Sequence, residues 1–310
     1  MVNPPFAAIA GSLVRINAEG LLGTGEEGEC AVDRTIGELA SRPVISVEAE
    51  IPVIEALKLM SARRISCIVV LLNAEPVGIL TERDVVFAAN WVIGQPSLRI
   101  REVMSKPVLT APSELTVANA YRLFRENGIR HLVVLGEQME MAGIFTQTDL
   151  VRAFRGQLFA STQDVTALMS RHVWKVTPDT TARQALSLMA SHAISGVVVT
   201  EGGRPVGVFS ERDAVRLVAA GCDLAGLPVS AVMTSPIITI PASAAPNFAI
   251  DLMRDHEVRR LLVLGEGGAL AGILTQTDLS RVLEGQGVAL VDKLVSAANT
   301  VACNSGLALH

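Results

Sequence analysis

The feature that most constrains this chain is an internal repeat. The stretch GIFTQTDLVRAF at 143–154 returns as GILTQTDLSRVL at 272–283, and GILTERD at 78–84 returns as GVFSERD at 207–213. Both returns follow a step of 129 residues, and GIFTQTD follows GILTERD after a step of 65. Four units therefore alternate, two closing in E-R-D and two in Q-T-D. Such spacing predicts an array of small structural units rather than one continuous core.

Each unit predicts the same order of secondary structure. In the first unit, VISV at 44–47 is a short β-branched strand, and the apolar residues that include Ala56 and Met60 recur at helical spacing. IVVLL and PVGIL then form two strands around the turn-type sequence NAEP, and a last helix begins near Thr81. The order is strand, helix, strand, strand, helix. A unit of this size, roughly 60 residues, has a thin core and needs a partner to cover its sheet.

This order, closed by G-h-h-[TS]-x-x-D in which h is apolar, resembles the cystathionine-β-synthase (CBS) domain, and the resemblance covers residues 36–285. It implies an α/β (α+β) fold of four βαββα repeats in two pseudo-twofold pairs, called Bateman modules. A disc of two such pairs is similar to the gamma subunit of AMP-activated protein kinase. We expect pairs at 36–157 and 165–285. The expected bounds are an N-terminal tail at 1–35, repeats at 36–95, 96–157, 165–222 and 226–285, and a C-terminal helix and tail at 286–310.

The repeated T-x-x-D has two interpretations. A Thr or Ser followed three residues later by an acid is typical of a capping box at a helix start. The same helix start offers free amides to an anion, and a carboxylate can accept hydrogen bonds from both ribose hydroxyls. All four units carry Asp where capping boxes prefer Glu or Gln, which favours binding. The resemblance implies ribose contacts for Asp84, Asp149, Asp213 and Asp278, and polar contacts near the phosphate for Thr81, Thr146, Ser210 and Thr275.

Adjacent cations begin the second strand of the Q-T-D units. Arg130–His131 and Arg259–Arg260 stand where the E-R-D units have Ser66–Cys67 and Ser195–Gly196. The planar guanidinium suits phosphate oxygens, and the resemblance implies phosphate contacts here. A solvated basic edge is the alternative. Charged pairs also precede the aspartates of the E-R-D units, at 82–83 and 211–212, and they either reach phosphates or are exposed charges.

Small side chains open the first helix of each unit. They leave room for a flat adenine, although close helix packing explains them equally well. The predicted adenine environment is Ala56, Ala120, Thr180, Ala185 and Ala249. From the family pattern we expect Thr180 and Ala185 beside Asp278, and Ile51 and Ala56 beside Asp149.

Composition excludes several classes of function. The net charge is −5, without a run of Lys or Arg, which argues against a nucleic-acid or anionic-membrane surface. No apolar run approaches the ~20 residues of a membrane helix, so we expect no membrane insertion. The four cysteines lie far apart in sequence and suit a reducing cytoplasm. Because no acid, base and nucleophile can be assembled into a site, we expect neither catalysis nor a catalytic cofactor.

The sequence thus predicts a cytoplasmic, non-catalytic sensor. It would bind AMP, ADP or ATP in clefts between paired repeats, and signal by reorienting the pairs toward an unknown protein partner. S-adenosylmethionine and cyclic dinucleotides remain alternative ligands, and a homodimer is one option for assembly. The alternative functions are a ligand-independent scaffold or oligomerisation module, and the regulatory fragment of a larger enzyme such as a diguanylate cyclase.

Overall fold

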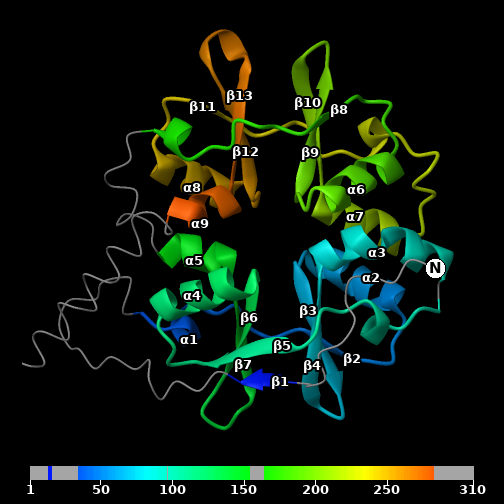
Figure 1. Ribbon diagram of the computed structural model, residues 1–310, viewed down its shortest axis with the longest axis vertical. Coiled ribbons are helices and arrows are strands. Elements are labelled where there is room, and N and C mark those ends of the chain that lie inside the picture. Colours follow the sequence, from blue (N-terminus) through cyan, green and yellow to red (C-terminus); the bar gives the residue numbers. More distant parts are fainter. Residues whose placement is uncertain (1–12, 16–33, 96, 154–163, 283–310) are drawn as a thin grey trace, which may run out of the picture. The chain divides into compact units, whose positions relative to one another are not determined.

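The computed structural model describes residues 13–15, 34–95, 97–153 and 164–282 of the chain. Each of the four repeats has the predicted order of strand, helix, strand, strand and helix (Figure 1). The predicted α/β class is therefore confirmed. The C-terminal helix expected within 286–310 and most of the tail at 1–35 lie outside the described residues.

The bounds of the elements repeat with the sequence. The first repeat has β2 (Ser46–Glu48), α2 (Val53–Arg63), β3 (Cys67–Leu72), β4 (Glu75–Thr81) and α3 (Glu82–Gly94). The second has β5 (Val108–Pro112), α4 (Val117–Asn127), β6 (His131–Leu135), β7 (Met141–Thr146) and α5 (Gln147–Ala153). The third has β8 (Lys175–Val176), α6 (Ala182–Ser191), β9 (Gly196–Glu201), β10 (Arg204–Ser210) and α7 (Glu211–Ala219). The fourth has β11 (Thr239–Pro241), α8 (Pro246–Asp255), β12 (Arg260–Leu264), β13 (Leu270–Thr275) and α9 (Gln276–Val282).

Shorter elements lie between and before the repeats. They are β1 (Leu13–Arg15), α1 (Ile36–Leu39) and the 3₁₀ helices η1 (Ile100–Glu102), η2 (Val165–Ala167), η3 (Val229–Ala231) and η4 (Glu266–Gly268).

One three-stranded pattern recurs in the sheets. The first strand of each repeat pairs parallel with the second, which pairs antiparallel with the third. β1 adds to the sheet of the second repeat, beside β5. On β3, Ile68 and Val69 point to opposite faces and both are fully buried. Both faces of this sheet are therefore covered, as its unbroken apolar sequence requires.

α2 shows how the apolar pattern becomes a buried helix face. Ala56, Leu57 and Met60 have 0%, 0% and 1% of their surface exposed. The charged residues between them lie on the other side of the helix. The helix ends where Arg64 adopts a left-handed backbone, with φ of 53°.

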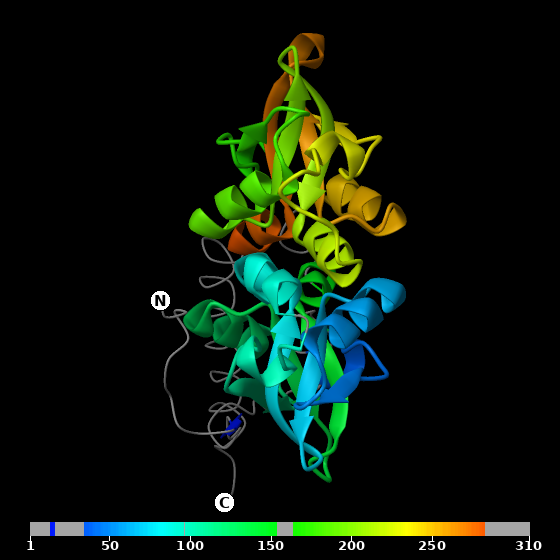
Figure 2. The same ribbon diagram turned by 90° about the vertical axis from the view of Figure 1, so that its right-hand side faces the viewer.

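The chain forms two compact units, and each combines alternate repeats. Unit 1 contains residues 44–109 and 172–238, and so holds the two repeats that close in E-R-D. Unit 2 contains residues 110–171 and those from 239 onward, and so holds the two Q-T-D repeats. In unit 1, α2 and α3 pack against α6 and α7 (Figures 1 and 2). In unit 2, α5 packs against α9. The expected pairs, at 36–157 and 165–285, each join a repeat of unit 1 to a repeat of unit 2. This pairing of consecutive repeats therefore stays a prediction.

A connecting segment completes each repeat. Ile79 on β4 and Ser105, beyond η1, exchange backbone hydrogen bonds of 3.0 and 2.9 Å. The segment after η1 therefore packs on the first repeat, although its sequence position lies in the predicted second repeat. A Cβ atom on Gly78 would come within 2.4 Å of the Met104 sulfur in this segment. This close approach explains the glycine that opens the closing motif. Equivalent backbone pairs join Ser41 with Ile144, Ser170 with Ile273, and Thr234 with Val208.

Candidate functional site

The four motif aspartates occupy the same place in their repeats. Each is the third residue of the closing helix and is buried, with between 5% and 7% of its surface exposed. In the second repeat, Oδ2 of Asp149 accepts hydrogen bonds from the Thr146 amide at 2.9 Å and from the Thr146 hydroxyl at 2.6 Å. The same two bonds form between Asp84 and Thr81, Asp213 and Ser210, and Asp278 and Thr275. In the first, second and fourth repeats the Thr hydroxyl also accepts from the Asp amide, at 3.2 to 3.4 Å. The capping interpretation of the motif is therefore confirmed in these three repeats, and in the third Asp213 makes its half of the cap.

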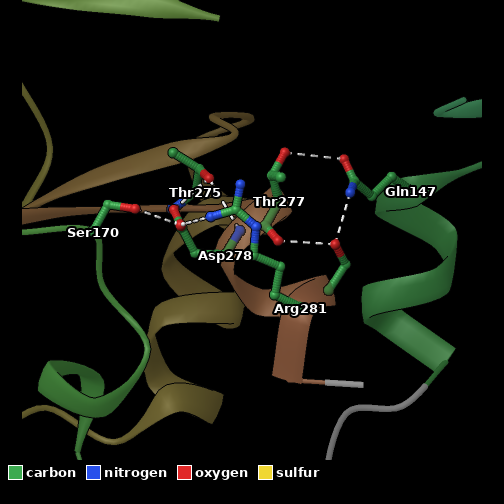
Figure 3. A network of polar contacts seen from close by, with 7 residues as sticks. Gln147, Ser170, Thr275, Thr277, Asp278 and Arg281 are labelled. Atoms are coloured by element: carbon green, nitrogen blue, oxygen red, sulfur yellow. Dashed lines mark hydrogen bonds and ion pairs between the residues drawn. The ribbon is translucent and has the colours of Figure 1, made fainter. Parts of the chain in front are cut away.

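The second carboxylate oxygen distinguishes the four sites. Oδ1 of Asp84 accepts a hydrogen bond from the Ser105 hydroxyl at 2.7 Å. Oδ1 of Asp278 accepts one from the Ser170 hydroxyl at 2.7 Å and lies 3.5 Å from Nη1 of Arg281 (Figure 3). The structure thus gives Asp278 two polar partners besides its own cap, one from its own helix α9 and one from the segment before β8.

The two other aspartates lack such a hydroxyl partner. Oδ1 of Asp213 lies 3.2 Å from Nη2 of Arg216, one helical turn further on. For Oδ1 of Asp149, the described part of the chain supplies no hydrogen-bond donor. Asp149 therefore keeps one acceptor oxygen that its cap does not use.

Burial affects the protonation of Asp149. The pKa of this carboxyl is raised above its ordinary value of 3.8, mainly because burial removes the charged form from water. The hydrogen bonds from Thr146 and the charge of Arg152 act in the opposite direction but do not prevail. A further donor at Oδ1 would stabilise the ionised carboxylate.

Sequence reasoning missed the serine and arginine partners of these carboxylates. Ser105 and Ser170 each follow a methionine just before the first strand of the next repeat, and Thr234 follows Met233 in the same way. This recurring M-[ST] was a usable signal. Its meaning needed the structure, since Ser105 and Asp84 are 21 positions apart and Ser170 and Asp278 are 108 apart.

The predicted cations lie beside the motif of their own repeat. His131 pairs with Thr146 across β6 and β7, and the carbonyl of Arg130 accepts a hydrogen bond from the Gln147 amide at 3.0 Å. In the fourth repeat, Arg260 pairs with Thr275, and the carbonyl of Arg259 accepts from the amide of residue 276 at 3.1 Å. All four basic side chains are half-buried. Their contact with phosphate stays a prediction.

The predicted adenine residues are closely packed. None of the four alanines has exposed surface, as expected for helix packing. The Thr180 hydroxyl lies 3.2 Å from the Thr177 amide and 3.1 Å from its hydroxyl. Contact between adenine and Ala56, Ala120, Thr180, Ala185 and Ala249 stays a prediction. The expected neighbours of Asp149 and Asp278 belong to the other unit, so their placement also stays a prediction.

The charged pairs of the E-R-D motifs contact each other across unit 1. Nε of Arg83 lies 3.5 Å from Oε1 of Glu211, and Nε of Arg212 lies 3.5 Å from Oε1 of Glu82. Both glutamates have only 2% of their surface exposed. The interpretation of these pairs as exposed charges is therefore wrong for Glu82 and Glu211.

Neither a metal-binding cluster nor a membrane-spanning helix occurs among the described residues. No group of three or more His, Cys, Asp and Glu side chains there is arranged to hold a metal ion. None of the helices described is both long and apolar enough to span a bilayer.

Comparison with known proteins identifies the family. The model of the CBS domain matches four segments, at residues 36–90, 100–156, 164–220 and 229–285. The chain belongs to the CBS domain family. The predicted resemblance to this family, in four tandem repeats, is thus confirmed. CBS-domain proteins are regulatory and often bind nucleotides.

Individual proteins are similar to this chain over part or most of its length. The protein MJ1404 of Methanocaldococcus jannaschii, described as uncharacterized, is 25% identical over 81% of this chain, which spans 62% of that relative. The CBS domain-containing protein YhcV of Bacillus subtilis is 34% identical over 36% of this chain and 79% of its own length. The solved structure of MJ1225 from M. jannaschii, described as a proposed archaeal homolog of g-AMPK, has a TM-score of 0.71. It is 17% identical and covers 80% of this chain and 99% of its own, so it shows that the fold is shared.

Proposed function

We propose that this CBS protein is a non-catalytic cytoplasmic sensor that binds an adenine nucleotide, AMP, ADP or ATP, at its motif aspartates. The observation that supports this most directly is the geometry of Asp149. One oxygen of this buried carboxylate is fixed by its cap, and the other has no hydrogen-bond donor among the described residues. A ribose brings two hydroxyl donors, which would satisfy that oxygen.

The charge beside Asp149 supports a phosphorylated ligand. His131 begins β6 and pairs with Thr146 at the end of β7, and Arg130 directly precedes it. Arginine donates to phosphate through a planar set of N–H groups. A nucleotide whose ribose contacts Asp149 would extend its phosphates toward this basic edge. Asp278, with Arg259 and Arg260 in the same positions, is the second site proposed.

Signalling would require the nucleotide to bind two arrangements of the repeats with different affinities. A nucleotide shifts an equilibrium between two arrangements of the repeats only if it binds one of them more tightly. In this proposal, a protein partner reads the change in arrangement and the nucleotide leaves unaltered.

The experiment is calorimetric titration of nucleotide-free protein with AMP, ADP and ATP. We expect binding by the wild type, and a loss of roughly tenfold or more for Asp149→Asn, because an amide has one acceptor oxygen and cannot serve the cap and the ribose with separate oxygens as a carboxylate does. Asp164→Asn is the matched control, since Asp164 also accepts a bond from a backbone amide but caps the 3₁₀ helix η2 and belongs to no T-x-x-D motif. No heat and no thermal shift with any of the three nucleotides would contradict the proposal. Mass spectrometry of small molecules that co-purify would then identify a different ligand.

A scaffold is the second candidate function, and the caps favour it. Every motif aspartate already has a structural role, and in three repeats both carboxylate oxygens have partners. A scaffold predicts that Asp149→Asn alters stability slightly and leaves all nucleotide titrations unchanged, since Asn also caps helices well.

A further inference from the structure

We propose that the two residues between the Thr or Ser and the Asp of each motif determine which repeats share a helical interface. Glu-Arg contacts Glu-Arg in unit 1, and Gln-Thr contacts Gln-Thr in unit 2. This inference concerns recognition between repeats and does not depend on nucleotide binding.

The motif divides its four positions between two tasks. The first and fourth residues meet in the cap, as Thr81 and Asp84 do. Successive residues of a helix point in different directions, so the second and third side chains are turned away from the cap. These inner positions, occupied by Glu82 and Arg83 in the first repeat, are the ones that contact the other repeat of the unit.

Unit 1 uses charge at the inner positions. Two reciprocal ion pairs connect α3 and α7, each joining a buried glutamate to the arginine of the opposite motif. The side chains of Arg83 and Arg212 are 37% and 43% exposed, whereas those of Glu211 and Glu82 are 2% and 3% exposed. A carboxylate removed from water to this extent requires compensation by a cation. In unit 1 the Arg at the third position of the opposite motif contributes one to each glutamate.

Unit 2 makes the corresponding contacts without charge. The Gln147 side chain donates to the Ser280 hydroxyl at 2.7 Å, and its amide oxygen lies 3.4 Å from the Thr277 hydroxyl (Figure 3). In the reciprocal direction, the Thr148 hydroxyl donates to the amide oxygen of Gln276 at 2.8 Å. Amide and hydroxyl groups satisfy one another at this interface, as a buried polar contact must.

Mixed interfaces would be unfavourable. A repeat with Glu-Arg facing one with Gln-Thr would leave a buried carboxylate opposite groups that carry no positive charge. Specific pairing depends on such penalties against the wrong partner as well as on contacts with the right one. The alternation of motifs along the chain therefore selects repeats one and three for one unit, and two and four for the other.

The test is an exchange of inner residues in the full chain. Glu211→Gln/Arg212→Thr places a Gln-Thr motif opposite the native Glu-Arg motif of the first repeat. We expect a fall in melting temperature of roughly 6–15 °C, because Glu82 keeps its burial and loses Arg212. Adding Glu82→Gln/Arg83→Thr makes both motifs Gln-Thr, and we expect at least half of the loss to be recovered. Glu82→Gln/Arg83→Thr alone is the second mismatched protein. The proposal would be overturned if the melting temperature of the fourfold variant fell by at least as much as the falls of the two mismatched proteins added together.

If the mismatched protein does not fold, two variants with fewer substitutions test the same proposal. Arg212→Gln leaves Glu82 without that arginine, and Glu82→Gln/Arg212→Gln removes both charges. We expect the double variant to melt above the single one, because the buried charge is then gone. The reverse order, or equal melting temperatures, would overturn the proposal. Arg204→Gln on β10 is the control for loss of a positive charge, since this side chain is exposed, and we expect no shift from it.

Discussion

Units 1 and 2 have the same architecture at their helical interfaces but opposite chemistry. The closing helices of unit 1, α3 and α7, meet through ion pairs of buried glutamates. Those of unit 2, α5 and α9, meet through amides and hydroxyls. The apolar core of unit 1 runs through both of its repeats, from α2 and α3 into α6 and α7. One backbone motif can therefore present either charged or neutral contacts while its aspartate keeps the same capping position.

The largest effect is expected from a pair of equivalent core residues. Phe145 and Phe209 occupy the same motif position in units 2 and 1, and both are fully buried. Replacement of either by Ala should cost about 3–5 kcal/mol of unfolding free energy through lost contacts and a residual cavity. Phe145→Ala should cost about 1 kcal/mol more, because Phe145 also stacks on Phe124 with ring centroids 5.8 Å apart. Urea unfolding of both variants measures the difference, and a larger cost for Phe209→Ala would contradict this ranking.

The interface contacts should give the next largest effect. Arg83→Gln removes the cation next to buried Glu211, and we expect a cost of about 1–3 kcal/mol after allowing for the partial exposure of the arginine. Gln147→Ala removes neutral hydrogen bonds in unit 2 and should cost about 1 kcal/mol. Urea unfolding measures both. Equal losses would show that charge does not distinguish the interfaces.

The pH dependence of stability should separate Asp149 from the other aspartates. Its raised pKa means that the folded state binds a proton more readily than the unfolded state does. The ionised carboxylate therefore costs stability near neutral pH, and this cost disappears as the pH falls through the folded pKa, above the ordinary 3.8. Relative to wild type, Asp149→Asn should be neutral or more stable at pH 7, and should lose that advantage toward pH 4.

The matched variant for this experiment is Asp278→Asn. That carboxylate has a serine and an arginine as additional partners. We expect this change to destabilise the protein at pH 7, by about 1 kcal/mol. Urea unfolding at both pH values provides the measurement. A loss at Asp149 as large as that at Asp278 would show that the two sites are equivalent.

The smallest signal is expected from a thiol beside the E-R-D motif. Burial, assisted by the charges of Glu82 and Asp84, raises the pKa of Cys67 to about 12. At pH 8 the native protein should therefore show negligible labelling of Cys67 by a thiolate-directed reagent, whereas half-buried Cys222 should react faster. Peptide mapping by mass spectrometry distinguishes the two. Rapid native-state labelling of Cys67 would mean that β3 opens readily.

The fold of each repeat was readable from local pattern. Apolar periodicity identified the strands and helices, and the repeated T-x-x-D located the start of each closing helix. These features depend on residues close in sequence, such as Thr146 and Asp149. The partners at the candidate sites were not readable in this way, because Ser170 reaches Asp278 only after the chain has folded. The Glu-Arg pairs were left undecided for the same reason, since the sequence does not state which motif faces which.

Patterns within the amino-acid sequence were enough to identify the four repeats, their family and the capping role of the motif aspartates. Periodicity and capping act over a few residues, and folding realises them in every copy alike. Tertiary packing brings Glu82 to Arg212 and Gln147 to Ser280, and within the described residues it brings no donor to the second oxygen of Asp149. Such differences arise where distant segments pack together, because burial and partner choice depend on what another part of the chain brings to the same place.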